Sequence, residues 1–412
     1  MRKVLLVLAI SLVGLGLGVS NALAKELVVD KDRVQCPNAD YTSIQAAVTA
    51  AFPGDKIKVC PDLYTESVTV PKTLDIVAAP KTALDSEDSC FATPPSAPDP
   101  TKDAIVDGVA YSFSLQANDI SLEGFVIQDD VTGVETSSSF SGYFIAENLV
   151  QSNTFGGINF LSSGTKESRA THNCLRSNGE GLLSEIGPLL ENARVDHNFA
   201  TGNSTGIDAS GVGARVNVTF DHNNAIGNDI SYLISNSTNS RIVENRAEAD
   251  GNAIGIGGDN HDLEVSHNTV LAGAASGIVV FTGESFPVFP GPNLNLQISH
   301  NFVTQRGGSR DGIRIIDAFL NSFVEYNKTV VNSRDGIQMG EGNTGNLIAH
   351  NEADQNGRDG IHSSGSSGNL FIDNSMFDNV LFDAADDARP LNVWSGNHCN
   401  TDFPPGTICG VN

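Results

Sequence analysis

Thr171–Leu182 reads THNCLRSNGEGL, and two close variants follow it, DHNFATGNSTGI over Asp196–Ile207 and DHNNAIGNDI over Asp221–Ile230. Looser copies of this phrase recur along the chain. The first asparagine of each copy marks its position, and the markers are Asn148, Asn173, Asn198, Asn223, Asn245, Asn268, Asn301, Asn327, Asn351, Asn374 and Asn397. Successive markers lie 22 to 26 residues apart, with one gap of 33. A near-constant period in this range predicts a solenoid with one turn per repeat.

Short strands fit these repeats better than helices do. Gly, Asn, Ser and Asp interrupt each unit every five to eight residues, and the pieces between them are short, β-branched and alternating. We therefore expect a coil of parallel strands whose inward side chains stack on their counterparts about 4.7–4.9 Å away. An asparagine at a bend can adopt a left-handed conformation and bond the amides of neighbouring turns. The repeated asparagines thus predict an internal ladder.

Each repeat also carries a small residue and then an aliphatic one about nine positions after the marker, as in Gly181-Leu182, Gly206-Ile207 and Gly312-Ile313. With this pattern the chain resembles the right-handed parallel β-helix proteins of the pectin-lyase-like superfamily. The resemblance implies an all-β fold, with one parallel β-helix domain over residues 25–412. It does not assign an activity, because this fold hosts many.

The first 24 residues indicate a secretory signal peptide. Arg2 and Lys3 precede an apolar run, and Ala22-Leu23-Ala24 forms a small-x-small cleavage site. A membrane anchor is the alternative, but no basic stop-transfer flank follows the run. No later stretch is long and apolar enough to span a bilayer. We expect a secreted or periplasmic monomer.

The chain is strongly acidic, with a net charge of −25. Nucleic acid is excluded as a partner, because its recognition needs a basic footprint. A polyanionic sugar is disfavoured unless a divalent cation such as Ca²⁺ bridges it to the protein. The same acidity is typical of a soluble exported surface.

Six cysteines in an exported chain predict disulfides. Cys36 and Cys60 would tie the N-terminal segment to the first turn, and Cys399 and Cys409 would close a C-terminal loop. Cys90 and Cys174 remain, and a bond between them is a third candidate that the spacing does not support. No Cys/His zinc spacing occurs.

Both ends of the solenoid are expected to be capped, because an open end exposes core and strand edges. In residues 25–55, Thr42 or Ser43 can begin a helix that Pro53-Gly54 ends, and the segment resembles the start of bacterial β-helix proteins and of pectin methylesterases. The apolar face of this helix comprises Ile44, Ala47, Val48 and Ala51. Residues 398–412 form the second cap.

Strands are expected near Lys56–Cys60, Ser67–Val70 and Leu74–Ala78. Two insertions predict surface loops, residues 80–104, rich in Pro, Ser and acid, and residues 282–293. The second loop carries Phe286 and Phe289. A loop at this position can wall a groove in which either ring stacks on a sugar.

Three successive repeats read SRDGIRI, SRDGIQM and GRDGIHS. They stack Arg310, Arg334 and Arg358 in one column, and Asp311, Asp335 and Asp359 in the next. Like charges in register repel unless they are paired. One interpretation is therefore structural, with the two columns neutralising each other around an ordinary Asp-Gly turn.

The alternative interpretation is catalytic. The three aspartates precede a Gly-aliphatic strand start, a position similar to that of the catalytic acids in polygalacturonase-like hydrolases. Glycoside hydrolysis uses two carboxyl groups about 5–5.5 or 6.5–9.5 Å apart, and neighbouring turns provide such distances. The resemblance implies a catalytic Asp311, Asp335 and Asp359, with Arg310, Arg334 and Arg358 binding substrate. The second of these repeats lacks the doubled Asp of that family, and its Gly-His-Gly and Arg-Ile-Lys are absent from the chain.

GGDNHDLEV offers a second catalytic candidate. Asp259, His261 and Asp262 are similar to the Asp-Pro-His-Asp tetrad of mannuronan epimerases, with Asn260 in place of Pro. The resemblance implies an acid/base or cation role for the two aspartates and proton transfer by His261. A polar turn is the alternative. A pectate-lyase-like activity would require a Ca²⁺ site and a basic residue, for which Arg314 is a candidate.

Six histidines precede marker asparagines, and alternation directs them outward. They are His172, His197, His222, His267, His300 and His350. Stacked neutral imidazoles can bind Cu or Zn, and periplasmic copper-delivery relatives occur in the superfamily. Solvent-exposed stacking without a metal is the alternative. Taken together, the residues favour a protein that binds or modifies extracellular polysaccharide, against a non-catalytic adhesin-like or envelope scaffold or a metal-associated β-helix protein.

Overall fold

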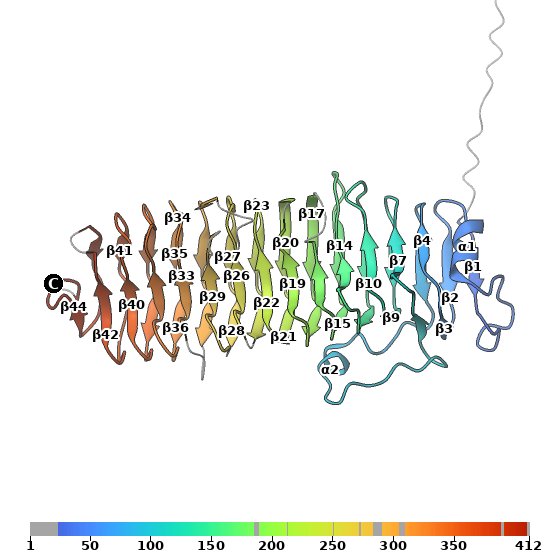
Figure 1. Cartoon of the computed structure of the whole chain (residues 1–412), viewed down its shortest axis with the longest axis horizontal. Helices are drawn as coiled ribbons and strands as arrows, with labels where there is room; N and C mark the ends of the chain where they lie inside the picture. Colours follow the sequence, from blue (N-terminus) through green and yellow to red (C-terminus); the bar gives the residue numbers. More distant parts are fainter. Residues whose placement is uncertain are drawn as a thin grey trace, which may run out of the picture.

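The computed structural model describes residues 24–184, 189–211, 213–249, 251–271, 273–282, 291–304, 310–388 and 391–409. In this part of the chain, three long parallel sheets of 16, 14 and 12 strands wind into one solenoid (Figure 1). Each strand pairs with its counterparts in the turns before and after it. The predicted parallel β-helix is confirmed.

The strands are grouped here by sheet. Sheet A contains β1 (Glu26–Val29), β2 (Lys56–Val59), β5 (Asp75–Ala78), β8 (Ser121–Glu123), β11 (Phe144–Ala146), β14 (Ser168–Thr171), β17 (Leu189–Asp196), β20 (Ala214–Asp221), β23 (Ser237–Thr238), β24 (Arg241–Val243), β27 (Glu264–Ser266), β31 (Gln297–Ser299), β35 (Phe323–Glu325), β38 (Leu347–Ala349), β41 (Leu370–Ile372) and β43 (Val393–Ser395). Sheet B contains β3 (Asp62–Tyr64), β6 (Ala104–Val106), β9 (Val126–Gln128), β12 (Leu149–Gln151), β15 (Cys174–Arg176), β18 (Phe199–Thr201), β21 (Asn224–Asn228), β25 (Arg246–Ala249), β28 (Thr269–Leu271), β32 (Phe302–Thr304), β36 (Lys328–Val330) and β39 (Glu352–Asp354). Sheet C contains β4 (Val68–Val70), β7 (Tyr111–Leu115), β10 (Thr132–Thr136), β13 (Gly156–Asn159), β16 (Glu180–Leu183), β19 (Thr205–Ala209), β22 (Ile230–Ile234), β26 (Ile254–Ile256), β29 (Ile278–Val280), β33 (Ile313–Ile315), β37 (Ile337–Met339), β40 (Asp359–Ser363), β42 (Phe382–Asp386) and β44 (Asp402–Phe403). A separate pair joins β30 (Asn293–Leu294) to β34 (Phe319–Leu320).

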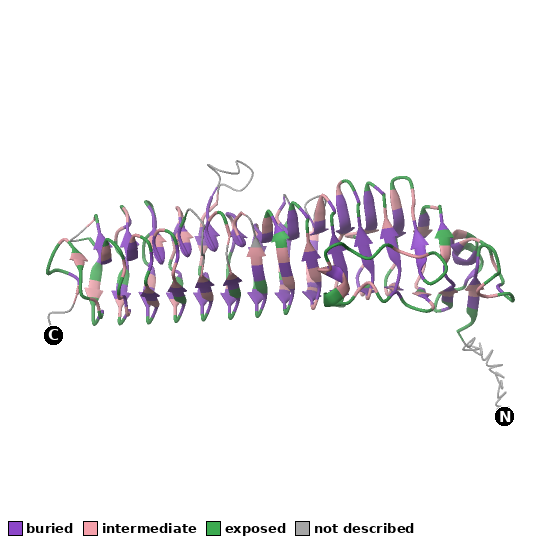
Figure 2. Cartoon of the chain, turned by 90° about the horizontal axis from the view of Figure 1, so that it is seen from below, coloured by how far each residue is buried: buried purple, intermediate pink, exposed green. Residues whose placement is uncertain are grey.

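The hydrophobic core fills the inside of the coil along its length (Figure 2). Inward positions of successive turns lie in register, so apolar side chains stack in columns. In sheet A, for example, Val195 pairs with Phe220, which pairs with Ile242, and all three are fully buried. Burying a Val, Ile or Phe side chain contributes about 1.5–3 kcal/mol, so these columns supply the main stabilisation.

The asparagine ladder runs inside the corner between sheets A and B. The backbone N–H and the side-chain Nδ2 of Asn198 both donate to Oδ1 of Asn223, each at 3.0 Å. Nδ2 of Asn198 also donates to the carbonyl of Ala170 at 2.9 Å. The buried amide groups at this corner therefore have hydrogen-bond partners, as buried polar groups generally do.

One detail of the prediction was wrong. The left-handed residue of each bend is not the asparagine but the residue before it, such as His172, His197 or His222. This conformation aims the histidine outward and lets the asparagine enter the core with an ordinary backbone.

Two further ladders occupy the other corners. Asn153, Asn178, Asn203 and Asn228 bond in series between sheets B and C, and Asn332, Asn356 and Asn379 repeat the arrangement later. Asn346, Asn369 and Asn392 do the same between sheets C and A. In these stretches each corner is thus stabilised by a column of hydrogen-bonded asparagine side chains.

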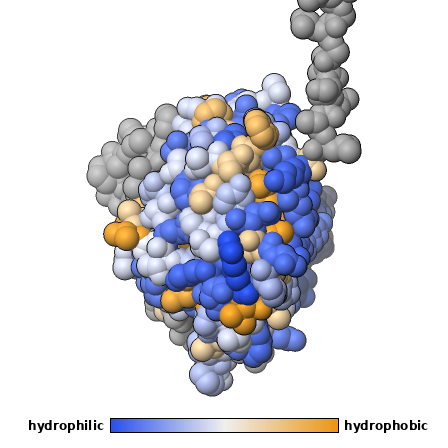
Figure 3. Space-filling view, turned by 90° about the vertical axis from the view of Figure 1, so that its right-hand side faces the viewer, coloured by the Kyte–Doolittle hydropathy of each residue, from blue (hydrophilic) through white to orange (hydrophobic). Residues whose placement is uncertain are grey.

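Helix α1 (Ile44–Ala50) lies at the N-terminal end of the coil, beside β1, β2 and β4. Ser43 is its N-cap, with the side chain accepting from the N–H of Ala46, and Ile44, Ala47 and Val48 are buried. Mostly hydrophilic side chains cover this end, with scattered apolar ones (Figure 3).

Residues 80–104 do not form a simple loop. They leave the solenoid after sheet A and return along sheet B, where α2 (Glu87–Cys90) lies against β15 and β18 (Figure 1). Arg176 donates to the carbonyls of Ser89 and Ser96, at 3.3 and 3.0 Å. We call residues 80–104 the strap.

Disulfides join Cys36 to Cys60, Cys90 to Cys174 and Cys399 to Cys409. The second fixes the strap to β15, and the third closes the C-terminal loop beside the buried Ile408. The expected signal peptide lies outside the described residues except for Ala24. Among the helices described, none combines the length and the apolar character that a bilayer crossing requires.

Candidate functional site

Asp311, Asp335 and Asp359 lie in one column where three successive strands of sheet C begin. Their exposed fractions are 0%, 0% and 2%. The N–H of Asp335 donates to Oδ1 of Asp311, and the N–H of Asp359 donates to Oδ1 of Asp335, both at 3.1 Å. The sequence analysis placed these residues together correctly, but their carboxylates lie under the surface and also bond neighbouring turns, as the ladder asparagines do.

Arginines cover the buried carboxylates. Arg358 donates to Asp335 through Nε at 2.6 Å and through its Nη2, and its Nε lies 3.3 Å from Asp359. Arg334 lies at 3.8 Å from Asp311. Each of these arginines therefore faces the aspartate of the preceding turn, while Arg310, the first of the column, is exposed.

His362 completes the cluster and was missed from the sequence. Its Nδ1 lies 3.4 Å from Asp359 and 3.7 Å from Asp335, and its Nε2 is 3.1 Å from the half-exposed Asp387. The ring is 9% exposed. The signal was present in GRDGIHS, because the residue after the inward Ile361 must face outward.

The three carboxyl groups have unequal electrostatics. Burial raises the pKa of Asp311, and the charge of Asp335 adds to the increase. Burial and Asp335 likewise raise the pKa of Asp359. Burial also opposes ionisation of Asp335, but hydrogen bonds from His362 and Arg358 outweigh it and lower the pKa of this residue. Asp335 is therefore the fixed negative charge of the cluster.

His362 responds to the same charges. Burial alone would lower its pKa, but the carboxylates of Asp335 and Asp387 raise it above the ordinary value. Nη2 of Arg358 also lies 2.5 Å from Nδ1 of His362, and because a guanidinium only donates, Nδ1 accepts there. The ring proton then lies on Nε2, toward Asp387, and can be donated from that atom.

One pair in the cluster is not bonded. Oδ2 of Asp311 and Nε of Arg314 are buried without a hydrogen-bond partner among the described residues, and they lie 3.7 Å apart. A buried polar atom without a partner costs free energy, so this position is the least settled part of the cluster.

An apolar recess adjoins the charged cluster on sheet C. Leu233, Val279 and Phe281 form a small hydrophobic cluster outside the main core. They line a cavity of about 150 Å³ together with Ile316 and Arg310. Charged and apolar side chains thus meet beside the 282–293 insertion. Phe286 and Phe289 of that insertion lie outside the described residues.

The second catalytic candidate is built as a turn. Asp259 and Asp262 both have left-handed backbones, and Asn260 between them is fully buried and bonded to Ser237 and Asn293. His261 is exposed, and Asp262 accepts from Asn295. Groups of three or more metal-ligating side chains within 4.8 Å of one another occur elsewhere in the described residues, at Asp335, Asp359 and His362 and at an N-terminal acidic group.

The histidine column is exposed and stacked at the corner between sheets A and B. The rings of His172, His197 and His222 follow one another at 5.0 Å with nearly parallel planes. Glu244 interrupts the column, and His267, His300, Tyr326 and His350 continue it at 4.8–5.0 Å. Glu244 and Tyr326 were not singled out from the sequence.

The comparisons with known proteins bear on the fold. No protein-family model matches the sequence, and no curated protein is detectably similar to it. Among solved structures, a DFA-IIIase from Arthrobacter chlorophenolicus A6, without its lid and in complex with GF2, has a TM-score of 0.53 at 13% identity, over 91% of this chain and 98% of that one. A periplasmic alginate epimerase has a TM-score of 0.44 at 12% identity, over 86% and 75%.

The Dettilon tailspike protein also has a TM-score of 0.44, at 14% identity over 85% of this chain. The match spans 62% of the tailspike, less than two thirds of its length. At such identities the likeness concerns the fold alone, and the DFA-IIIase match supports it most directly. The chain therefore has a right-handed parallel β-helix fold similar to that of the DFA-IIIase.

Proposed function

We propose that this chain is an exported protein that binds an extracellular polysaccharide along the outer face of sheet C and modifies it there. The observation that supports the proposal is the buried Asp335, which holds the partly exposed Arg358 and lies beside the mostly buried His362. Burying stacked carboxylates costs free energy, and a column of hydrophobic side chains would stabilise the coil more. A polar column retained at this cost favours a functional role.

We assign different roles to the buried and to the more exposed side chains of the cluster. Asp335 and Asp359 are too deeply buried to touch a sugar, so we assign them the positioning of the groups above them. Arg334 and Arg358 present guanidinium donors to sugar oxygens or carboxylates. His362 is the proton donor, and the apolar recess near Arg310 accommodates the hydrophobic face of a sugar ring.

A non-catalytic glycan-binding scaffold is the second candidate. It is favoured by the bonds from Asp335 N–H to Asp311 and from Asp359 N–H to Asp335, which resemble those of the asparagine ladders. In that case the aspartates are structural, and only the arginines contact the glycan.

A panel of neutral and acidic polysaccharides tests both candidates, with binding and product formation measured separately. We expect Arg334→Gln to weaken binding about tenfold, the effect of losing one charge-assisted hydrogen bond. We expect His362→Gln to lower turnover about 100-fold while binding is retained, the scale of a general-acid contribution. Arg241→Gln is the matched control, because Arg241 is an exposed, ion-paired arginine on sheet A.

The results separate the alternatives. Binding that depends on Arg334 without any product supports the scaffold. Absence of binding across the panel, or equal losses in the Arg334 and Arg241 variants, contradicts the proposed face.

A further inference from the structure

The histidine column has two halves that differ in what lies behind the rings. Asp196 and Asp221 directly precede His197 and His222, and each carboxylate lies within hydrogen-bond distance of the adjacent Nδ1, at 2.8 and 3.0 Å. Ser266 and Ser299 occupy the same positions before His267 and His300. Among the described residues, carboxylates thus directly precede histidines in the first half, whereas the carboxylate of the second half, Glu325, precedes Tyr326.

The carboxylates fix which ring nitrogen carries the proton. Asp196 is ion-paired with Arg169, and Asp221 with Arg194, so both act as acceptors. Nδ1 of His197 and of His222 must then be the donor. The outward Nε2 is then the nitrogen available to a ligand, the arrangement by which carboxylates prepare histidines for metal binding. In His222 this nitrogen donates to Glu244 when no ion is bound, and a bound ion takes the place of that proton.

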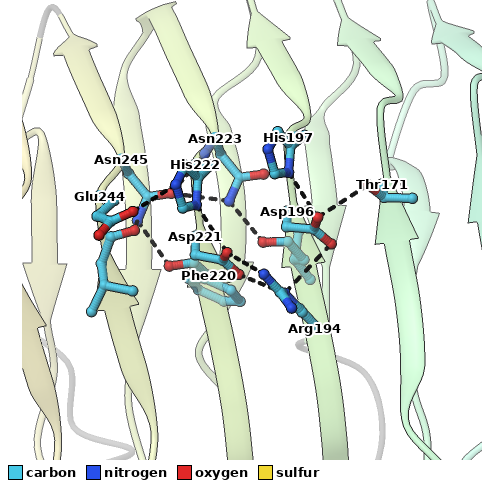
Figure 4. A network of polar contacts seen from close by, with 12 residues as sticks. Thr171, Arg194, Asp196, His197, Phe220, Asp221, His222, Asn223, Glu244 and Asn245 are labelled. Atoms are coloured by element: carbon cyan, nitrogen blue, oxygen red, sulfur yellow. Dashed lines mark hydrogen bonds and ion pairs between the residues drawn. The ribbon is translucent and has the colours of Figure 1, made fainter.

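The outward nitrogen of His222 contacts a further carboxylate. Nε2 of His222 lies 2.5 Å from an oxygen of Glu244 in the next turn (Figure 4). His197 lies parallel to His222 on the other side, with ring centroids 5.0 Å apart. These side chains line an open cavity of about 380 Å³, together with Glu87 of the strap and Phe199 of β18. The site therefore lies beside the strap and is open to solvent.

We propose that His197, His222 and Glu244 form a binding site for one divalent first-row transition-metal ion, Zn²⁺ or Cu²⁺. Two imidazole nitrogens and one carboxylate oxygen are ligands that these ions prefer, whereas Ca²⁺ and Mg²⁺ prefer oxygen alone. Three protein ligands leave a coordination position open toward the groove.

The ligand distances require His197 and Glu244 to move. Zn–N bonds of about 2.1 Å allow two nitrogens on one ion to be at most about 4.2 Å apart, but the stacked rings are 5.0 Å apart, so His197 must tilt toward His222. Glu244 must move back, because its oxygen is 2.5 Å from Nε2 of His222, too close for both atoms to bind one ion at tetrahedral angles. His197 can tilt because its side chain is 43% exposed and, among the described residues, is hydrogen-bonded at Nδ1 alone, and the tilt replaces its stacking on His172.

The site is independent of the proposed polysaccharide face. It lies at the corner between sheets A and B, and its nearest turn, that of Glu244, precedes the turn of Asp311 by two repeats. The half-column of His267, His300 and His350 provides an internal comparison, because its rings stack in the same way and no carboxylate directly precedes any of its histidines.

The experiment is a titration of untagged, chelator-stripped protein with ZnCl₂ and separately with CuCl₂, followed by calorimetry and by metal analysis after dialysis. We expect one tightly bound ion per chain. His222→Gln should weaken its binding at least 100-fold, whereas His300→Gln, which removes an equally exposed stacked histidine, should change the affinity less than twofold. Electron paramagnetic resonance of the Cu²⁺ form should report two imidazole nitrogens, and one in His197→Gln.

The proposal is overturned if the wild-type protein retains no ion, or if the His222 and His300 variants lose affinity equally. Circular dichroism shows whether each variant is folded. If His222→Gln does not fold, Glu244→Gln tests the same ion through an exposed side chain, and unchanged affinity there refutes the site.

Discussion

Two buried carboxylates of the same column, Asp311 and Asp335, illustrate how neighbours decide what a residue contributes. Asp335 is hydrogen-bonded to Arg358 and lies 3.7 Å from His362, whereas Oδ2 of Asp311 has no hydrogen-bond partner among the described residues. We expect Asp335→Asn to destabilise the fold by about 3 kcal/mol at pH 7, because it leaves the partly buried Arg358 without its counter-charge. We expect Asp311→Asn to be neutral or stabilising, because an amide retains the acceptor for the N–H of Asp335.

The pH dependence has opposite signs at the two residues. The pKa of Asp335 lies below its ordinary value of 3.8, so its contribution to stability is complete above that value and disappears as the pH falls through the folded-state pKa. The pKa of Asp311 lies above 3.8, so its ionisation destabilises the fold increasingly as the pH rises. Urea unfolding at pH 7 and pH 4 should therefore show the advantage of Asp311→Asn shrinking at the lower pH. Equal losses in both variants at pH 7 would contradict this account.

Residue-level prediction from the sequence succeeded where a pattern repeats. Asn198 and its counterparts were placed in the core because they recur at a fixed period, and the structure confirms it. His362 was missed because its neighbours in the same column are Gln338 and Arg314, so no repetition marked it. Its partners come from three separate turns, which only the folded chain brings together.

At the scale of elements, the strap joins parts of the coil that are far apart in sequence. The Cys90–Cys174 disulfide spans 84 residues, against 10 for Cys399–Cys409. By the chain-entropy estimate these loops correspond to about 4–5 and about 3 kcal/mol of stabilisation. We expect a Cys90→Ala/Cys174→Ala variant to lose more stability in chemical denaturation than Cys399→Ala/Cys409→Ala. The reverse order would indicate that the strap contributes little to the folded coil.

Local sequence patterns predicted the first helix and several strands of the N-terminal part. The sequence predicted strands near β2, β4 and β5, and a helix beginning at Thr42 or Ser43, because each has its own cap or alternation, and the structure has Ser43 as the N-cap. It missed α2, because nothing in a segment rich in Pro and Ser indicates that four residues will be held against sheet B. That arrangement depends on Cys174 and Phe199, which belong to distant turns.

On the scale of the whole molecule, stability is expected to vary along the axis, because each turn contacts mainly its neighbours. The 8-residue strands β17 and β20 pair over seven positions in the middle of the coil. At the C-terminal end of sheet A, β43 pairs only with β41, over three positions. Hydrogen exchange followed by mass spectrometry should show faster exchange in β41 and β43 than in β17 and β20. Uniform protection along the chain would contradict a turn-by-turn stability.

The equal spacing of the first ladder residues has a consequence for how such a chain changes over evolutionary time. From Asn148 through Asn198, each Nδ2 donates to the Oδ1 found 25 residues later, at 3.0 Å in all three cases. A 25-residue segment cut from one asparagine to the next is therefore interchangeable with its neighbours. Insertion or loss of a whole turn preserves every ladder bond, whereas a shift of one residue would turn inward side chains outward. The coil can thus lengthen or shorten by one turn at a time without requiring a new kind of ladder contact.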